Sequence, residues 1–109
     1  MLASILLFVL AALAEIGGGY LMWLWLREGR PLWTGVIGAL VLVLYGLLPT
    51  LQPPTLDFAR VYATYGGLFI VASLLWGRIV EGRVPDPPSI WGASLALVGA
   101  LIIAYWPRT

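Results

Sequence analysis

Glu15 is the only charged residue in an apolar stretch that runs from Ala3 to Leu26, and it lies near the middle of that stretch. Because a helix rises about 1.5 Å per residue, a helix here would cross the roughly 30 Å hydrocarbon core of a bilayer with the carboxyl group close to the midplane. An acidic side chain at that depth costs roughly 2.5 to 3.5 kcal/mol and usually faces a protein interior or an ion pathway. We therefore predict that Glu15 binds protons or a cation.

Two tyrosines in a later apolar stretch carry groups that complement such a carboxylate. Tyr62 and Tyr65 are three residues apart, so they would share a face of a helix. Their hydroxyls can reach a carboxylate, and their rings offer π-faces to a cation. Gly66 and Gly67 follow directly, and they would let another backbone come close or permit a kink. All four are candidate site residues.

Small residues share the helical face of Glu15. At helical spacing this face carries Ala11, Gly18 and Gly19, so we predict a groove floored by almost bare backbone beside the carboxylate. A bulky partner would fit such a groove. Tight packing against another helix is the alternative explanation, and the two are compatible.

The composition is that of a membrane protein. Hydrophobic residues make up 61% of the chain, charged residues 10%, and the mean hydropathy is +0.98, whereas an ordinary soluble domain carries about 25% charged residues. The sequence contains no cysteine and no histidine, which removes thiol chemistry and the usual transition-metal ligands. A net charge of +1 is too small for binding nucleic acid. We predict a protein in the lipid bilayer that is not an enzyme and has no metal and no cofactor.

Four apolar stretches of about twenty residues divide the chain, and short segments rich in Gly and Pro separate them. The predicted helices cover about residues 3–26, 32–51, 59–80 and 89–106, and Pro49 should bend the last turn of the second. Loops this short make sequential helices antiparallel neighbours. We predict an all-α bundle of four transmembrane helices in a single domain, residues 1–109.

The last of these helices has no charge but carries a stripe of small residues. Because such stripes mark helix contacts in membranes, we assign it to association between subunits. Packing within one chain is a nearly equal alternative. The candidate dimer residues are Gly92, Ala96, Gly99 and Ala100.

The arginines bear on the orientation in the membrane. The sequence places four of them on one side and two on the other: Arg27, Arg30, Arg78 and Arg83, against Arg60 and Arg108. The positive-inside rule then favours both termini outside the cytoplasm. A bias this small is also compatible with insertion both ways, so a fixed and a dual topology stay open.

Three motifs carry a resemblance to a known family. They are Ala12-Leu13-Ala14-Glu15-Ile16-Gly17, Tyr62-Ala63-Thr64-Tyr65-Gly66-Gly67, and Gly92 with Gly99-Ala100-Leu101-Ile102-Ile103. Together they resemble the small multidrug resistance transporters. The chain is more similar still to the YnfA family of bacterial inner-membrane proteins, and this likeness extends over essentially the whole chain, through Trp23-Leu24-Trp25-Leu26-Arg27 and Arg60-Val61-Tyr62-Ala63.

The resemblance implies a dimer, of the chain with itself or with a paralogous subunit, in a bacterial inner membrane. Two embedded glutamates would bind either protons or a lipophilic cation, and the cation would be exported in exchange for protons. By that similarity Glu15 is the shared site, Tyr62 and Tyr65 line it, and the fourth helix joins the subunits. The transporters typically have Trp where this chain has Tyr65, so the resemblance does not extend to the range of substrates.

Three hypotheses of function follow. The leading one is a proton-coupled exporter of small organic cations that uses Glu15. The second is a structural or accessory membrane subunit that transports nothing, in which a protonated Glu15 bonds a neighbouring helix. The third is a narrow carrier of a guanidinium compound or a polyamine.

Overall fold

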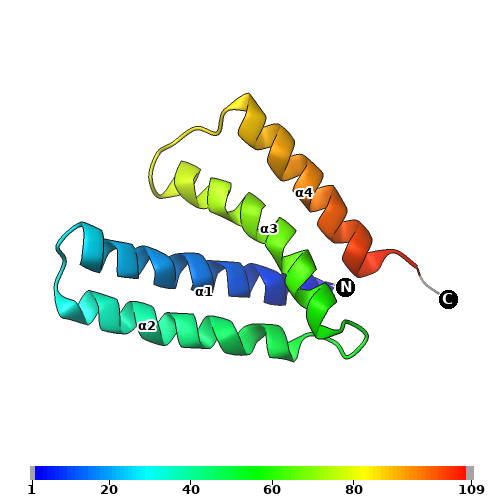
Figure 1. Cartoon of the computed structure of the whole chain (residues 1–109), viewed down its shortest axis with the longest axis horizontal. Coiled ribbons are helices and arrows are strands. Elements are labelled where there is room, and N and C mark those ends of the chain that lie inside the picture. The colour runs from blue at the N-terminus through cyan, green and yellow to red at the C-terminus, as the bar shows by residue number, and fades with distance from the viewer. Residues whose placement is uncertain (1, 108–109) are drawn as a thin grey trace. The chain divides into compact units, whose positions relative to one another are not determined.

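The structure, a computed structural model, describes residues 2–107, so Arg108 lies outside the described residues. It contains four α-helices: α1 (Leu2–Arg27), α2 (Leu32–Leu47), α3 (Phe58–Ile79) and α4 (Pro87–Tyr105). A short 3-10 helix, η1 (Leu48–Leu51), continues α2 and contains Pro49. Four spans, with η1 counted as part of the second, are long and apolar enough to cross a membrane. The all-α fold with four transmembrane helices is thus confirmed (Figure 1).

The chain divides into two units, one from residue 1 to 51 and one from residue 52 to 109. The first is the antiparallel pair α1 and α2, and the second is the antiparallel pair α3 and α4 (Figure 1). We call them the first and the second hairpin and describe each by itself. The single domain over residues 1–109 stays a prediction.

The loop of the first hairpin begins at a glycine in the left-handed region. Gly29 has a φ of 68°, which residues with a Cβ rarely adopt. On either side of it, the backbone N–H groups of Glu28 and Arg30 both donate to the carbonyl of Leu24, at 3.2 and 3.1 Å. These bonds satisfy a carbonyl that the helix end leaves without an intrahelical partner.

The loop of the second hairpin repeats this arrangement with the same three residue types. Gly82 has a φ of 70°, and the N–H groups of Glu81 and Arg83 both donate to the carbonyl of Gly77, at 3.2 and 2.9 Å. Both loops therefore form the same turn with the sequence Glu-Gly-Arg. In the second loop the Arg83 guanidinium also lies 3.6 Å from the Glu81 carboxylate, with both side chains in solvent.

Aspartates begin both helices of the second hairpin. Asp57 accepts a hydrogen bond from the N–H of Arg60, and Asp86 accepts one from the N–H of Ser89, each at 2.9 Å. Both carboxylates thereby satisfy N–H groups that a helix start leaves unpaired. Hydrogen bonding to Ser89 lowers the pKa of Asp86 below its usual value of 3.8.

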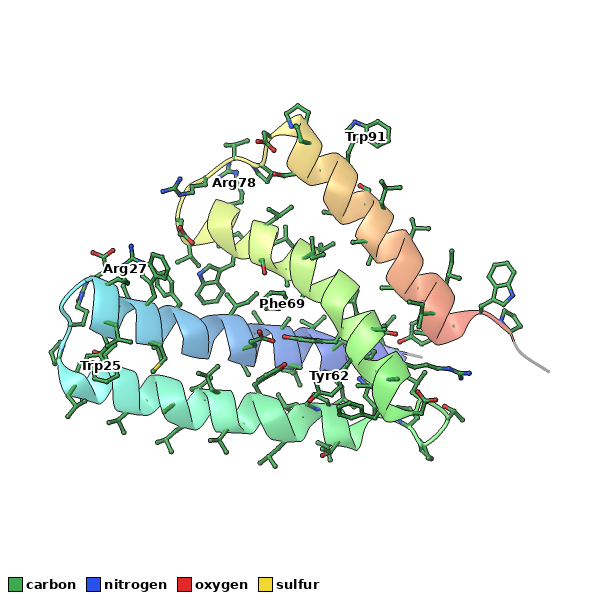
Figure 2. All side chains as sticks on the ribbon, in the orientation of Figure 1. Trp25, Arg27, Tyr62, Phe69, Arg78 and Trp91 are labelled. Carbon is green, nitrogen blue, oxygen red and sulfur yellow. The ribbon has the colours of Figure 1, made fainter. Side chains whose placement is uncertain are left out.

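Glycines let α1 and α2 approach closely in the first hairpin. A Cβ atom on Gly18 would lie 2.9 Å from the Gly38 carbonyl oxygen, and one on Gly38 would lie 2.9 Å from the Gly18 carbonyl oxygen. Nearer the loop, the ring of Trp25 covers Gly35 so closely that a Cβ there would overlap it (Figure 2). The two backbones meet where both lack side chains, as in other close helix pairs in membranes.

The second hairpin is built on the same principle with one glycine. A Cβ atom on Gly67 of α3 would lie 2.5 Å from the Ala100 Cβ and 2.6 Å from the Ala96 carbonyl oxygen, both on α4. Ala100 is buried, as are Ala93 and Ala104 on the same helix. The backbone of α3 at Gly67 thus packs directly against the small side chains of α4.

Candidate functional site

Glu15 lies on the buried face of α1. Ala11, one turn before it, is 1% exposed, and Gly18, one turn after it, is buried against α2. Residues spaced by three or four share a helix face, so the Glu15 side chain leaves α1 on this same face. Glu15 itself is half-buried. Among the residues in the four described spans it is the only acidic one.

The packing of the first hairpin determines which turn of α2 faces Glu15. Moving back along α1, Trp25 lies against Gly35, the Met22 backbone N against Gly38, and Gly18 against Leu42. Because Gly18 also contacts Gly38, it faces the turn of α2 from Gly38 to Leu42.

Glu15 lies one turn before Gly18, so in this antiparallel pair it faces the next turn of α2, which includes Tyr45. The interval from Leu42 to Tyr45 continues the face of α2 that meets α1. Tyr45 is half-buried. A phenol and a carboxyl group therefore lie on facing surfaces of one hairpin, and a phenol can donate a hydrogen bond to a carboxylate.

The predicted tyrosine pair lies on α3 in two different environments. Tyr62 is 40% exposed, and its ring packs against Phe58 with the centroids 4.5 Å apart. Tyr65 is buried, and its ring lies 5.8 Å from that of Phe69. Each tyrosine thus stacks on a phenylalanine four residues away along α3 (Figure 2 labels Tyr62 and Phe69).

A hydroxyl lies between these tyrosines in the sequence. Thr64 is fully buried, and its hydroxyl oxygen has no hydrogen-bond partner among the described residues. It shares a helical face with Gly67, three residues on, and Gly67 packs against α4. Thr64 therefore belongs to the packed side of α3.

The predicted groove residues differ in what surrounds them. Gly18 and Gly67 lie in close helix contacts within their hairpins, whereas nothing would come within 4 Å of a Cβ placed on Gly19 or Gly66. Gly19 and Gly66 therefore present open backbone. At Gly18 and Gly67, tight packing against another helix, the alternative explanation given above, is sufficient reason for a residue without a side chain.

The small residues of α4 separate in a similar way. Ala96 and Ala100 face Gly67 within the second hairpin, while Gly92 and Gly99 have nothing within 4 Å of a Cβ. Ala96 and Ala100 are thus occupied by packing within one chain, whereas Gly92 and Gly99 form an open face of α4. Association through α4 stays a prediction.

The site residues fall into two groups by hairpin. Glu15, Ala11, Gly18 and Gly19 lie in the first, and Tyr62, Tyr65, Gly66 and Gly67 lie in the second. The described residues include no cluster of acidic side chains that would hold a metal ion.

The family model "Uncharacterised BCR, YnfA/UPF0060 family" matches residues 1–109 of this chain. The chain belongs to the YnfA/UPF0060 family. Among curated members, a UPF0060 membrane protein of Herpetosiphon aurantiacus is 62% identical over 105 residues, which cover 96% of each chain. A UPF0060 membrane protein of Clostridium beijerinckii is 56% identical, over 96% of this chain and 95% of its own.

A third member of the YnfA/UPF0060 family, from Bacillus subtilis, is 54% identical over 108 residues, 99% of this chain and 98% of its own. No solved structure matches the chain. The relatives are named as membrane proteins, and the chain carries four apolar spans. It is a multi-pass protein of the bacterial inner membrane.

Reasoning from the sequence missed Tyr45. A signal was present: Gly35, Gly38, Leu42 and Tyr45 follow one another at intervals of three and four, and the first two are small. Small residues at that spacing indicate the face of α2 that contacts a neighbour. Tyr45 is the polar residue at the end of that face.

Proposed function

We propose that this protein is a proton-coupled exporter of small organic cations and that Glu15 is the group for which protons and cations compete. The observation that carries the proposal is the position of Glu15 on the buried face of α1, as the only acidic residue of the described spans. An ionisable residue inside a membrane is by default a candidate for ion or substrate transport.

The chemistry required is competition at one carboxyl group. When ionised, the carboxylate attracts a cation, and when protonated, it loses that attraction. A cation that enters therefore displaces a proton, and a proton that returns displaces the cation. If the site opens to each side of the membrane in turn, this competition exchanges one for the other.

Aromatic residues would complete the site. Tyr45 lies on the surface of α2 that faces α1 near Glu15, and its hydroxyl would hold the carboxylate in place. Tyr62 and Tyr65 of the second hairpin would offer ring faces to the cation. The backbone is open at Gly19 in the first hairpin and at Gly66 in the second, and each would accept a bulky guest beside it.

We further propose that two copies form the working unit. The described spans of one chain hold a single carboxylate, whereas two copies related by a two-fold axis would bring two into one cavity. Two ionised carboxylates repel each other, which favours a cation or protons between them. The open face of α4 at Gly92 and Gly99 would join the copies.

The experiment is cation uptake into proteoliposomes loaded at acid pH, with tetraphenylphosphonium as the probe. The wild type should take up the cation in exchange for internal protons, and Glu15→Gln should reduce uptake to the rate of protein-free liposomes. Glu28→Gln, which removes an exposed carboxylate in the first loop, is the matched control and should keep the wild-type rate.

Other outcomes distinguish the alternatives. Unchanged uptake by Glu15→Gln contradicts the proposal. Loss of folded protein in Glu15→Gln, with no uptake by the wild type, favours a structural subunit. Uptake of guanidinium or spermidine without tetraphenylphosphonium favours a narrow carrier.

A further inference from the structure

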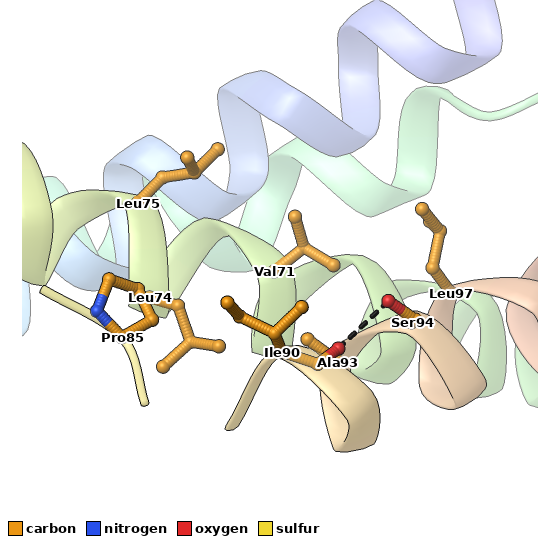
Figure 3. Close-up of a pocket in the computed structure, with 8 residues that line it drawn as sticks. All are labelled: Val71, Leu74, Leu75, Pro85, Ile90, Ala93, Ser94 and Leu97. Atoms are coloured by element: carbon orange, nitrogen blue, oxygen red, sulfur yellow. Dashed lines mark hydrogen bonds between the residues drawn. The ribbon is translucent and has the colours of Figure 1, made fainter. Parts of the chain in front are cut away.

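The second hairpin carries a cavity of about 230 Å³ near its loop end, open on one side. Its walls come from one side of α3, the first turns of α4 and Pro85 of the loop (Figure 3). An apolar cavity of about 150 Å³ is large enough to bind a benzene molecule. This one therefore has room for a segment of hydrocarbon chain.

The lining offers nothing to a polar ligand. It is made of apolar side chains, among them Val71, Leu74, Ile90 and Leu97, and Ser94 carries its one hydroxyl. That hydroxyl already donates to the carbonyl of Ile90 at 2.8 Å, the bond drawn in Figure 3. A guest in this cavity gains from burying apolar surface and finds no free donor.

A cationic side chain lies one turn beyond the cavity. Arg78 follows Leu74 and Leu75 by four and three residues, so it shares their face of α3. Its exposed side chain is therefore on the same side of α3 as the two leucines, one turn nearer the loop. Figure 2 shows Arg78 at the loop end of α3.

The carboxylates of the nearby loop have other partners. Glu81 pairs with Arg83, and Asp86 accepts the N–H of Ser89. No described carboxylate lies within ion-pair distance of Arg78, whose side chain is exposed at the end of the span. The guanidinium is therefore available to an anion from outside the chain.

We infer that the second hairpin binds one anionic phospholipid, with an acyl chain in the cavity and the headgroup phosphate on Arg78. The apolar cavity suits the acyl chain of such a lipid, and the guanidinium of Arg78 suits its phosphate. The cavity lies below the end of the membrane span, where acyl chains begin, and the arginine lies at that end, where phosphates are. The site uses none of the residues proposed for transport.

The test is native mass spectrometry of the purified full chain from micelles that contain equal amounts of phosphatidylglycerol and phosphatidylcholine with identical acyl chains. The wild type should retain phosphatidylglycerol in preference. Arg78→Gln should reduce that preference about fivefold, the factor that corresponds to the roughly 1 kcal/mol of one arginine at an anionic surface. Arg83→Gln changes the net charge equally and should leave the preference unchanged, because Arg83 already pairs with Glu81.

The cavity itself is tested by filling it. Ala93→Leu from α4, or Leu74→Phe from α3 if the first variant does not fold, should lower retention of both lipids. Leu95→Phe alters an exposed position of α4 outside the cavity and should not. Equal retention of the two lipids by the wild type, an equal effect of Arg83→Gln, or unchanged retention in a folded cavity-filling variant would overturn the inference. So would a second copy of the chain found in place of the lipid.

Discussion

The central residue is Glu15, an acidic side chain whose burial in a membrane span costs free energy. Glu15 is recognisable from the sequence because a lone charge in a membrane span stands out from its surroundings. Tyr45, on the facing surface of α2, does not stand out in this way, since a tyrosine in an apolar segment is also a common interface anchor. Its assignment depends on the contacts of Trp25, Met22 and Gly18 with α2, which only the packed hairpin provides.

Removal of the Tyr45 hydroxyl tests this pairing. A hydrogen bond to a charged group contributes about 1.5 to 3 kcal/mol, so Tyr45→Phe should weaken binding of tetraphenylphosphonium by roughly tenfold or more. Isothermal titration calorimetry in detergent at fixed pH measures the change. Tyr20→Phe is the control, because Tyr20 lies on α1 away from the face of Glu15 and Gly18. Equal affinities of Tyr45→Phe and the wild type would remove Tyr45 from the site.

Helices and loops follow closely from local sequence. The predicted starts and ends agree with α1, α3 and α4 to within a few residues, and Pro49 lies in the 3-10 turn that ends the second span. Gly29 and Gly82 mark both tight loops. These features depend on proline, on glycine and on runs of apolar residues, which act over a few positions of the chain.

The choice of contact face does not follow from the same signals. In lipid, outward and inward faces are both apolar, so hydrophobic periodicity says little about which side of α4 meets α3. The small residues of α4, Gly92, Ala96, Gly99 and Ala100, predict a single contact surface on this helix. In the structure Ala96 and Ala100 lie against Gly67, whereas Gly92 and Gly99 are open.

Two adjacent glycines of α3 provide a matched test of this packing. Gly67→Ala should destabilise the second hairpin by about 1 to 3 kcal/mol, because the new methyl group overlaps Ala96 and Ala100. Gly66→Ala places the same group in open space, and better helix propensity should stabilise it by up to about 1 kcal/mol. Unfolding in mixed detergent micelles measures both. Equal effects of the two substitutions would mean that α3 and α4 do not cross at Gly67.

At the scale of the whole molecule, the chain consists of two hairpins that turn by the same Glu-Gly-Arg loop and pack on glycine. They differ in the groups proposed for transport: the first carries the carboxylate, and the second carries the stacked tyrosines. The family, the helices and the membrane location could be predicted from the sequence. A site that joins the two hairpins, or two copies of the chain, depends on contacts among apolar surfaces that the order of residues does not distinguish.

The most direct test of the account is release of protons when a cation binds. Tetraphenylphosphonium is added to the purified protein in weakly buffered detergent, and a pH-sensitive dye records the result. We predict that the wild type releases protons in proportion to the cation bound, that Glu28→Gln does the same, and that Glu15→Gln releases none. Cation binding by the wild type without proton release, or equal release from Glu15→Gln, would contradict competition at Glu15.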